Sequence, residues 1–481
     1  MQIVLSSVLA LLVIAALAFR GPYRGLWLFM AVTPLGAAAA INLPAVGGAS
    51  ILVADLVALT MFALVIIHRE GPRLMAGTMR VGHPGFWLML LFIYATFASL
   101  MFPTIFSGQT EVFSLSRSAN ESGIISIPLR PSSGNLTQLF RLGLGVAIFF
   151  ALATVFRVRP DGTTILTAIV VATVVNAGLG WLDVATYAVG AEALLEPIRS
   201  ANYSILYDVR MVGVKRMIGG FPEASAFGYF SLGLFAFWFQ YWLDTPRSRL
   251  VVIMVVLAAV AVLRSTSSAS YVAFLAYLMT AGLIWAMRTF GRETSRRSVG
   301  IAISAVIVAW LGAIAIFASY EYVSSVQAFL DRALFNKLDG ASGVERLSWN
   351  AQAFRNFWET ATMGAGLGSV RASSWIMATL ASLGAIGTAL FFAFIASVLL
   401  PSSGTMNDDK RLNIVRALQS VCVALLISAC LTGATPDLGI FFFAVCGLAA
   451  GLRRGVILEH GSGTPHLRNQ AKGTIDNVLR A

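Results

Sequence analysis

The sequence contains few charged residues. Only 12% of its 481 residues are Asp, Glu, Lys or Arg, whereas 58% are hydrophobic, and the mean hydropathy is +0.80. Soluble globular domains carry about 25% charged residues, so this scarcity excludes an ordinary soluble protein. A membrane-spanning helix takes about 20 apolar residues, and the chain is long enough for about a dozen of them. The sequence therefore predicts a polytopic membrane protein.

Cysteine and histidine are scarce as well. The three cysteines, Cys422, Cys430 and Cys446, lie in late apolar runs and are expected to pack as small hydrophobic residues. Neither a disulfide framework nor a thiolate metal site is indicated. None of the four histidines belongs to a cluster with metal-ligand spacing, and no Walker-type loop is present. We therefore expect no metal, no cofactor and no ATP-driven transport by this chain.

Lysine is rare too, with four lysines against thirty arginines in a chain of net charge +12. Most basic residues flank apolar runs in short clusters, which argues against nucleic-acid binding and marks the cytoplasmic face of a membrane protein. The alternating clusters lie at residues 20–24, 69–80, 157–159, 247–249, 288–297, 410–411 and 453–454. This orientation places the polar tail 455–481 in the cytoplasm, where we expect it to be disordered.

Apolar runs predict an all-α fold of about 13 transmembrane helices, with a range of about 12 to 14. Residues 1–454 would form a single transmembrane domain, and the N-terminus is external if every predicted helix spans. The predicted helices lie near residues 2–19, 24–41, 50–67, 85–102, 136–156, 163–184, 223–243, 249–264, 269–288, 298–319, 371–400, 412–432 and 436–452.

Three longer connections fall on the predicted external face, at residues 103–135, 187–222 and 319–370. Long loops in compact proteins are usually functional or disordered. The first is rich in Ser, Gly, Pro and Asn, which predicts irregular cover. The other two are large and mix charged with aromatic residues, which predicts a folded surface.

The third connection contains a predicted helix from Gly343 to Trp358. Its apolar residues fall on one stripe at helical spacing: Leu347, Ala351, Phe354 and Trp358. This pattern fits a helix that lies on the membrane surface, and equally a helix packed against other loop residues.

Cationic side chains dominate the chemistry available in the two larger loops. The candidates are Arg210, Lys215 and Arg216 in one loop, and Arg332, Lys337, Glu345, Arg346 and Arg371 in the other. Arginines on opposing loops could clamp a diphosphate by bidentate hydrogen bonds and stabilise its departure without a metal. Alternatively, they reach lipid headgroups or form salt bridges within the loops.

Three further residues are candidates inside or at the ends of the predicted spans. Glu223 follows Pro222 at the start of a span, where it either caps the helix or acts as a general base. Asp55 and Arg141 lie in the outer parts of their spans. They either line a cavity or pair with other groups of the bundle.

The chain resembles the O-antigen ligase and polymerase superfamily of membrane glycosyltransferases, and most closely its exopolysaccharide polymerase branch. Four stretches carry the resemblance. Arg216–Gly228 is similar to the family's R-x-x-G-x-F-x-E-x-S entry into a span, and Leu263–Tyr271 is similar to its T-x-S-R turn but lacks that arginine. Arg332–Gly343 has the family's Arg-x10-Gly spacing, and Gly364–Gly387 is similar to a loop exit that ends in L-G-x-x-G. Ligases of this superfamily have a His-Asn pair where this chain has Ser373 and Ser374, which favours a polymerase over a ligase.

The resemblance implies a helical bundle of the GT-C-like kind in the bacterial inner membrane, with its active site facing the periplasm. The implied substrate is a polyprenyl-diphosphate-linked oligosaccharide drawn from the membrane lipid. Catalytic roles would fall to Glu223, Arg216 and Arg332, with Glu345 as a second candidate base. Substrate would contact Arg210, Lys215, Arg346, Arg371, Glu345 and Arg141. A chain-length regulator or export complex is an expected partner, while a ligase and a lipid-oligosaccharide flippase are the alternative functions.

Overall fold

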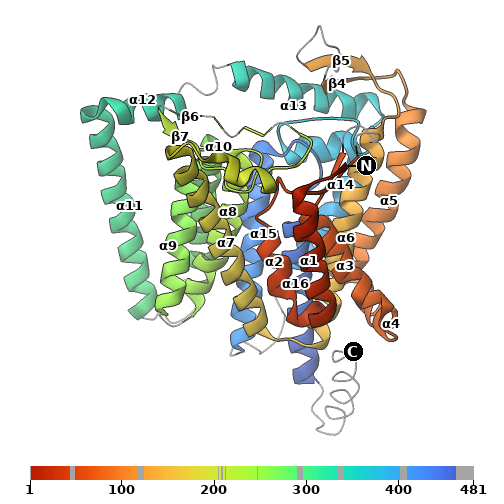
Figure 1. Ribbon diagram of the computed structural model, residues 1–481, viewed down its shortest axis with the longest axis horizontal. Coiled ribbons are helices and arrows are strands. Elements are labelled where there is room, and N and C mark those ends of the chain that lie inside the picture. Colours follow the sequence, from red (N-terminus) through yellow and green to blue (C-terminus); the bar gives the residue numbers. More distant parts are fainter. Residues whose placement is uncertain are drawn as a thin grey trace.

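Long apolar helices run side by side through the molecule in a computed structural model of the chain (Figure 1). Within the described residues, eight are long and apolar enough to cross a membrane. They are α1 (Leu5–Arg24), α5 (Pro84–Ile105), α6 (Ser133–Val158), α7 (Gly162–Ala188), α10 (Ser268–Thr289), α14 (Trp375–Leu399), α15 (Lys410–Thr432) and α16 (Ile440–Gly461). The prediction of a helical, multi-pass membrane protein is therefore confirmed.

The structure describes residues 2–43, 49–115, 124–203, 205–206, 208, 210–211, 213–245, 248–289, 296–333, 341–400 and 409–461. Further helices run beside the eight in Figure 1: α3 (Val53–Ile67), α8 (Ala224–Asp244), α9 (Arg249–Arg264) and α11 (Arg296–Tyr322). The predicted disordered tail 455–481 begins too early, because residues 455–461 continue α16 and Gly455 packs against α6; residues 462–481 lie outside the described residues. The predicted total of about 13 spans thus stays a prediction.

The predicted span 24–41 is wrong as a single helix. Helix α2 covers only Leu26–Val32 and is followed by strand β2 (Ala39–Leu43). Pro34 and Gly36 lie between the two elements, and proline disfavours a helical conformation in the residue before it. Strand β2 then pairs antiparallel with β1 (Gln2–Ile3) and β3 (Ala49–Leu52), because a chain that has left the helix must find other partners for its backbone groups.

Three glycines let α16 lie directly against the backbone of α6. A Cβ atom on Gly447 would lie 2.6 Å from the Phe149 carbonyl oxygen, and one on Gly451 would lie 2.8 Å from that of Ala153. Gly455 repeats the contact one turn later. Small residues spaced four apart bring membrane helices into close van der Waals contact. This seam fixes α6 in the middle of the bundle, where it also packs against α3 and α5.

The three long connections gather at one end of the bundle, together with the N-terminus (Figure 1). This end carries β6 (Arg210–Met211), β7 (Val214–Lys215), α12 (Ser324–Ala333) and α13 (Ala341–Glu359), as well as a hairpin of β4 (Glu111–Leu115) and β5 (Ile124–Pro128). Irregular cover was thus the wrong expectation for 103–135. Val112 and Phe113 have high strand propensity, and Ile125 and Ile127 alternate with polar or small neighbours, as in a strand.

Helix α13 confirms the helix predicted at 343–358 and shows which way its stripe faces. Leu347, Phe354 and Trp358 are exposed. The other side of the helix is buried and holds Asn356, whose amide donates to the Glu111 carbonyl oxygen at 2.6 Å. The helix therefore rests on the β4–β5 hairpin by its polar and small residues and presents its apolar stripe outward, as a membrane-surface helix would.

Candidate functional site

A buried aspartate holds the Arg210–Pro222 segment in place. Asp183, in the last turns of α7, is 1% exposed and accepts a 2.5 Å hydrogen bond from Arg199. The ammonium of Lys215 lies 3.3 Å away, and the backbone N–H of Ile218 donates at 2.9 Å. A buried carboxylate needs such partners to remain charged. These contacts fasten the middle of the segment, from Lys215 to Gly219, to α7.

Asp183 is not among the candidate residues predicted from the sequence. Its signal is a lone acidic residue inside an apolar run, which marks a structural or functional position by default. The residues that satisfy it lie 16 to 36 positions further along the chain, and only the folded loop brings them back.

Lys215, a predicted diphosphate ligand, is a member of this buried cluster. Its side chain is 7% exposed, and it donates to Asp183 and to the Arg216 carbonyl oxygen at 3.0 Å. Burial lowers the pKa of Lys215, while the Asp183 charge opposes that shift. Its charge is thus already matched, and the geometry favours a role in positioning the loop.

Arg216, the next residue, has a different environment. Its side chain is half-buried, and its Nε is buried without a hydrogen-bond partner among the described residues. Burial lowers the pKa of Arg216, while the nearby Glu223 carboxylate and the Tyr271 hydroxyl oppose that shift. This guanidinium is held in a partly desolvated place without an ion pair in the described part of the chain, which suits it to an anionic ligand.

Glu223 stands at the N-cap position of α8, yet its side chain does not cap the helix. The carboxylate is exposed and accepts from the Ser225 hydroxyl. Capping, the simpler of the two predicted roles, is therefore not what the side chain does. A carboxylate that is accessible and close to Arg216 is placed for acid–base chemistry.

The turn between α9 and α10 meets the same loop. Arg264 donates to the Lys215 carbonyl oxygen at 3.0 Å, which adds a cation that the sequence analysis did not select. A Cβ on Gly228 would lie 2.0 Å from the Ser270 hydroxyl oxygen, so α8 approaches this turn as closely as only glycine permits. Two of the four family-like stretches, Arg216–Gly228 and Leu263–Tyr271, are thus adjacent in space.

The candidates of the third loop lie elsewhere on the same end. Glu345 and Arg346 are exposed on α13. Arg371 lies over the Trp349 ring at 5.5 Å and lines a cavity of about 490 Å³ with Arg130. Arg332 lies in the last turn of α12, and Lys337 falls outside the described residues. No contact within the described residues joins these groups to Arg216.

A cavity of about 380 Å³ with a mainly apolar lining and a few charged groups opens beside residues 210–222, called the Arg216 loop below. Its lining includes Pro222, the neighbour of Glu223, together with Asp55, Arg141 and Asp437. Asp55 and Arg141 thus line a cavity, and no ion pair joins them within the described structure. The cavity therefore combines two carboxylates with one guanidinium in a partly apolar enclosure.

Within this cavity Asp55 is 7% exposed, and its Oδ2 accepts from the Leu52 N–H at 2.9 Å. Tyr203 donates from its hydroxyl to the Gly36 carbonyl oxygen at 2.5 Å. Burial raises the pKa of Tyr203 to about 12, while the Arg141 charge opposes the shift. Tyr203 therefore remains a neutral hydrogen-bonding wall, and the charged groups that face the space are carboxylates and arginine.

The described residues contain no group of three or more His, Cys, Asp or Glu side chains that could hold a metal ion. The chain matches no protein-family model, and the search among curated proteins found no match. What the fold and composition define is the class of a mostly helical, multi-pass membrane protein.

Proposed function

We propose that this protein is a membrane glycosyltransferase that polymerises polyprenyl-diphosphate-linked oligosaccharide units on the external face of the bacterial inner membrane. The observation that carries the proposal is Arg216, a half-buried cation beside the exposed Glu223. The buried Nε of Arg216 has no hydrogen-bond partner among the residues that the structure describes. A cation in such a place gains most from an anionic ligand, because solvent screens the interaction less than at an open surface.

The surroundings of Arg216 support a diphosphate in particular. Arg264 is attached to the same loop through the Lys215 carbonyl. Arg210 is exposed at the other end of the loop, where it donates to the Tyr187 hydroxyl and lies 4.0 Å from Asp208. The neighbouring cavity, with Arg141 in its wall, offers room for sugar residues. Guanidinium groups on and against one loop, beside a cavity with a further arginine in its wall, suit a ligand that carries two linked phosphates and a sugar.

The proposed step is a displacement at a sugar carbon. A hydroxyl oxygen of the acceptor unit forms a bond to the anomeric carbon of the donor, and the bond from that carbon to the diphosphate oxygen breaks. The diphosphate leaves with the bonding electrons and is stabilised by Arg216 and its neighbours. The hydroxyl proton passes to a carboxylate, for which Glu223 is the first candidate and Asp55 of the adjoining cavity the second.

The test uses the purified full-length chain and one synthetic lipid-linked repeat unit. We expect Arg216→Gln to reduce polymer formation by about 10²-fold or more, since the departing charge loses a fixed donor. Arg355→Gln removes an exposed arginine from α13 and should leave the rate unchanged. Thermal unfolding of both variants in detergent verifies that they are folded.

An equal polymer yield from both variants would refute the diphosphate role of Arg216. The same assay separates the alternatives. Product that appears only when a second acceptor is added would identify a ligase, and movement of the lipid-linked unit between leaflets without polymer would identify a flippase. Either result would overturn the proposed polymerase.

A further inference from the structure

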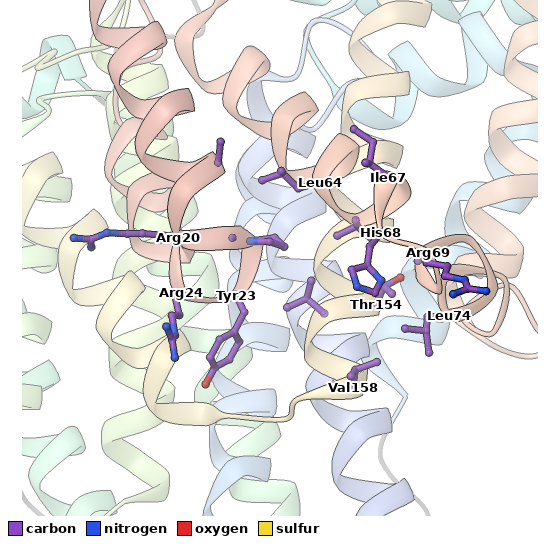
Figure 2. Close-up of a pocket in the computed structure, with 16 residues that line it drawn as sticks. Arg20, Tyr23, Arg24, Leu64, Ile67, His68, Arg69, Leu74, Thr154 and Val158 are labelled. Carbon is purple, nitrogen blue, oxygen red and sulfur yellow. The ribbon is translucent and has the colours of Figure 1, made fainter. Parts of the chain in front are cut away.

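A second cavity, of about 420 Å³, lies at the opposite end of the bundle from the Arg216 loop (Figure 2). It lies where α1 ends, between this helix, the end of α3 and the last turns of α6. Helix α1 is kinked there, because Gly21 has φ +73° and ψ 166° and is followed by Pro22. The kink redirects the last residues of the helix and leaves space beside α6.

The rim of this cavity is basic and its wall is apolar. Arg20, Arg24, Arg69 and His68 belong to the lining, and none of the described lining residues is acidic. In Figure 2, Arg20 and Arg69 extend toward opposite sides of the space, with His68 between them. The wall between these cations is formed by aliphatic side chains of α3 and α6, including Leu64 and Val155.

One group in the lining lacks a partner. Thr154 is 3% exposed, and its hydroxyl has no hydrogen bond among the described residues. Threonines in membrane helices usually donate to the carbonyl four residues earlier, as Thr173 does to Ile169 at 2.8 Å. A buried hydroxyl without a partner is destabilising, and a ligand oxygen in the cavity would relieve the penalty.

We propose that this cavity binds an anionic membrane phospholipid. Its phosphate group would lie among the arginines of the rim, one of its oxygens would accept from Thr154, and its acyl chains would follow the aliphatic wall. Basic pockets between membrane helices are suited to such headgroups. A phospholipid would contact both the arginines and the aliphatic wall. Free phosphate would contact the same arginines but would make no contact with the wall. The site does not depend on the proposed polymerase.

The binding test titrates the purified chain in detergent with phosphatidylglycerol, phosphatidylcholine or inorganic phosphate and counts retained ligands by native mass spectrometry. We expect phosphatidylglycerol to be retained in preference to both others. Arg24→Gln with Arg69→Gln should weaken its binding at least about tenfold, since each exposed cation near a phosphate adds attraction. Arg249→Gln removes an exposed arginine from the same end outside the cavity and should have no effect.

The Thr154 hydroxyl allows a test of a single hydrogen bond to the bound lipid. Thr154→Val should weaken phosphatidylglycerol binding about fivefold, the value of one ordinary hydrogen bond. Thr388→Val removes another buried hydroxyl, which has no partner in the described part of the chain and lies outside this cavity, and this variant should not change binding. Equal binding by these two variants would overturn the role of Thr154.

A photoactivatable phosphatidylglycerol applied to the unmutated chain locates the site independently of any variant. Cross-linked peptides should come from residues 18–24, 64–74 or 154–158. Labelling elsewhere, or equal retention of phosphatidylcholine, would refute the proposal. Retention of inorganic phosphate as firm as that of the lipid would assign the cavity to a free anion and would also refute it.

Discussion

Two buried aspartates lie near helix ends at the same end of this membrane bundle, and they differ in how many partners they have. Asp183 of α7 is contacted by two cationic side chains and two backbone N–H groups. Asp55 of α3 accepts from one backbone N–H and otherwise lines a cavity. Both are almost fully buried.

The number of partners distinguishes an aspartate that stabilises the fold from one that is available to a ligand. A buried carboxylate whose hydrogen bonds are all made within the protein stabilises one arrangement of the chain and has little left to offer a ligand. A buried carboxylate with few partners and access to a cavity is a candidate for chemistry. We therefore assign Asp183 to the architecture of the Arg216 loop and Asp55 to the cavity beside it.

The largest effect on stability is expected from Asp183→Ala. Removal of the carboxylate leaves Arg199 and Lys215 buried without their counter-charge, which costs about 3–5 kcal/mol. Thermal and denaturant unfolding in detergent measure the loss. Asp208→Ala is the matched control, because Asp208 is 67% exposed and lies 4.0 Å from Arg210, and exposed pairs contribute about 0–1 kcal/mol. Equal losses of unfolding free energy in the two variants would show that Asp183 is not a special stabilising group.

A third aspartate should show an intermediate effect. Asp161 caps α7 by accepting from the Thr163 N–H at 2.9 Å, and it also accepts from Tyr23. Burial acts to raise the pKa of Asp161, but the hydrogen bonds from Tyr23, Thr164 and Thr163 outweigh it and lower this pKa to about 2. Asp161→Ala should therefore reduce the free energy of unfolding at pH 7 by about 1 kcal/mol.

The pH dependence of that loss follows from the depressed pKa. Because the folded-state value lies below the unfolded one, the contribution of Asp161 is complete above about pH 4 and disappears as the pH falls toward about 2. Unfolding of the variant and the unmutated protein across this range measures the difference. A difference that stays constant down to pH 2 would show that the carboxylate charge is not what stabilises the helix end.

The smallest effect on stability, and a large one on activity, is expected from Asp55→Asn. The amide oxygen still accepts from the Leu52 N–H, so the free energy of unfolding should change by less than about 1 kcal/mol. If the carboxylate takes part in proton transfer, polymer formation should fall about 10²-fold or more. Comparison with Glu223→Gln ranks the two candidate bases. An Asp55→Asn variant that is strongly destabilised but still active would show that Asp55, like Asp183, stabilises the fold and does not take part in proton transfer.

The sequence predicted the apolar helices well, because membrane spans depend on composition over about 20 consecutive residues. It also predicted the helix at 343–358 and the presence of charged groups in the Arg210–Pro222 loop. It failed at 24–41, where one proline and one glycine ended the helix, and at 103–135, where two short strands pair across residues whose composition is typical of loops.

The partners of the charged residues could not be predicted in the same way. Lys215 and Arg216 are adjacent in sequence and equally plausible as ligands of a diphosphate. Lys215 pairs with Asp183, which lies 32 residues earlier. Arg216 has no ion pair in the described structure, and its Nε has no hydrogen-bond partner there. Similarly, nothing near Arg264 in the sequence indicates that it donates to the Lys215 carbonyl, 49 residues away.

By itself, the sequence determined that this chain is a helical membrane protein and that its loops carry the cationic side chains, since hydrophobicity and charge are local properties of a segment. Only the tertiary structure decided which charges are matched and which remain available. Pairing depends on distance and burial, and both arise when α7, α8 and the α9–α10 turn close around the Arg216 loop.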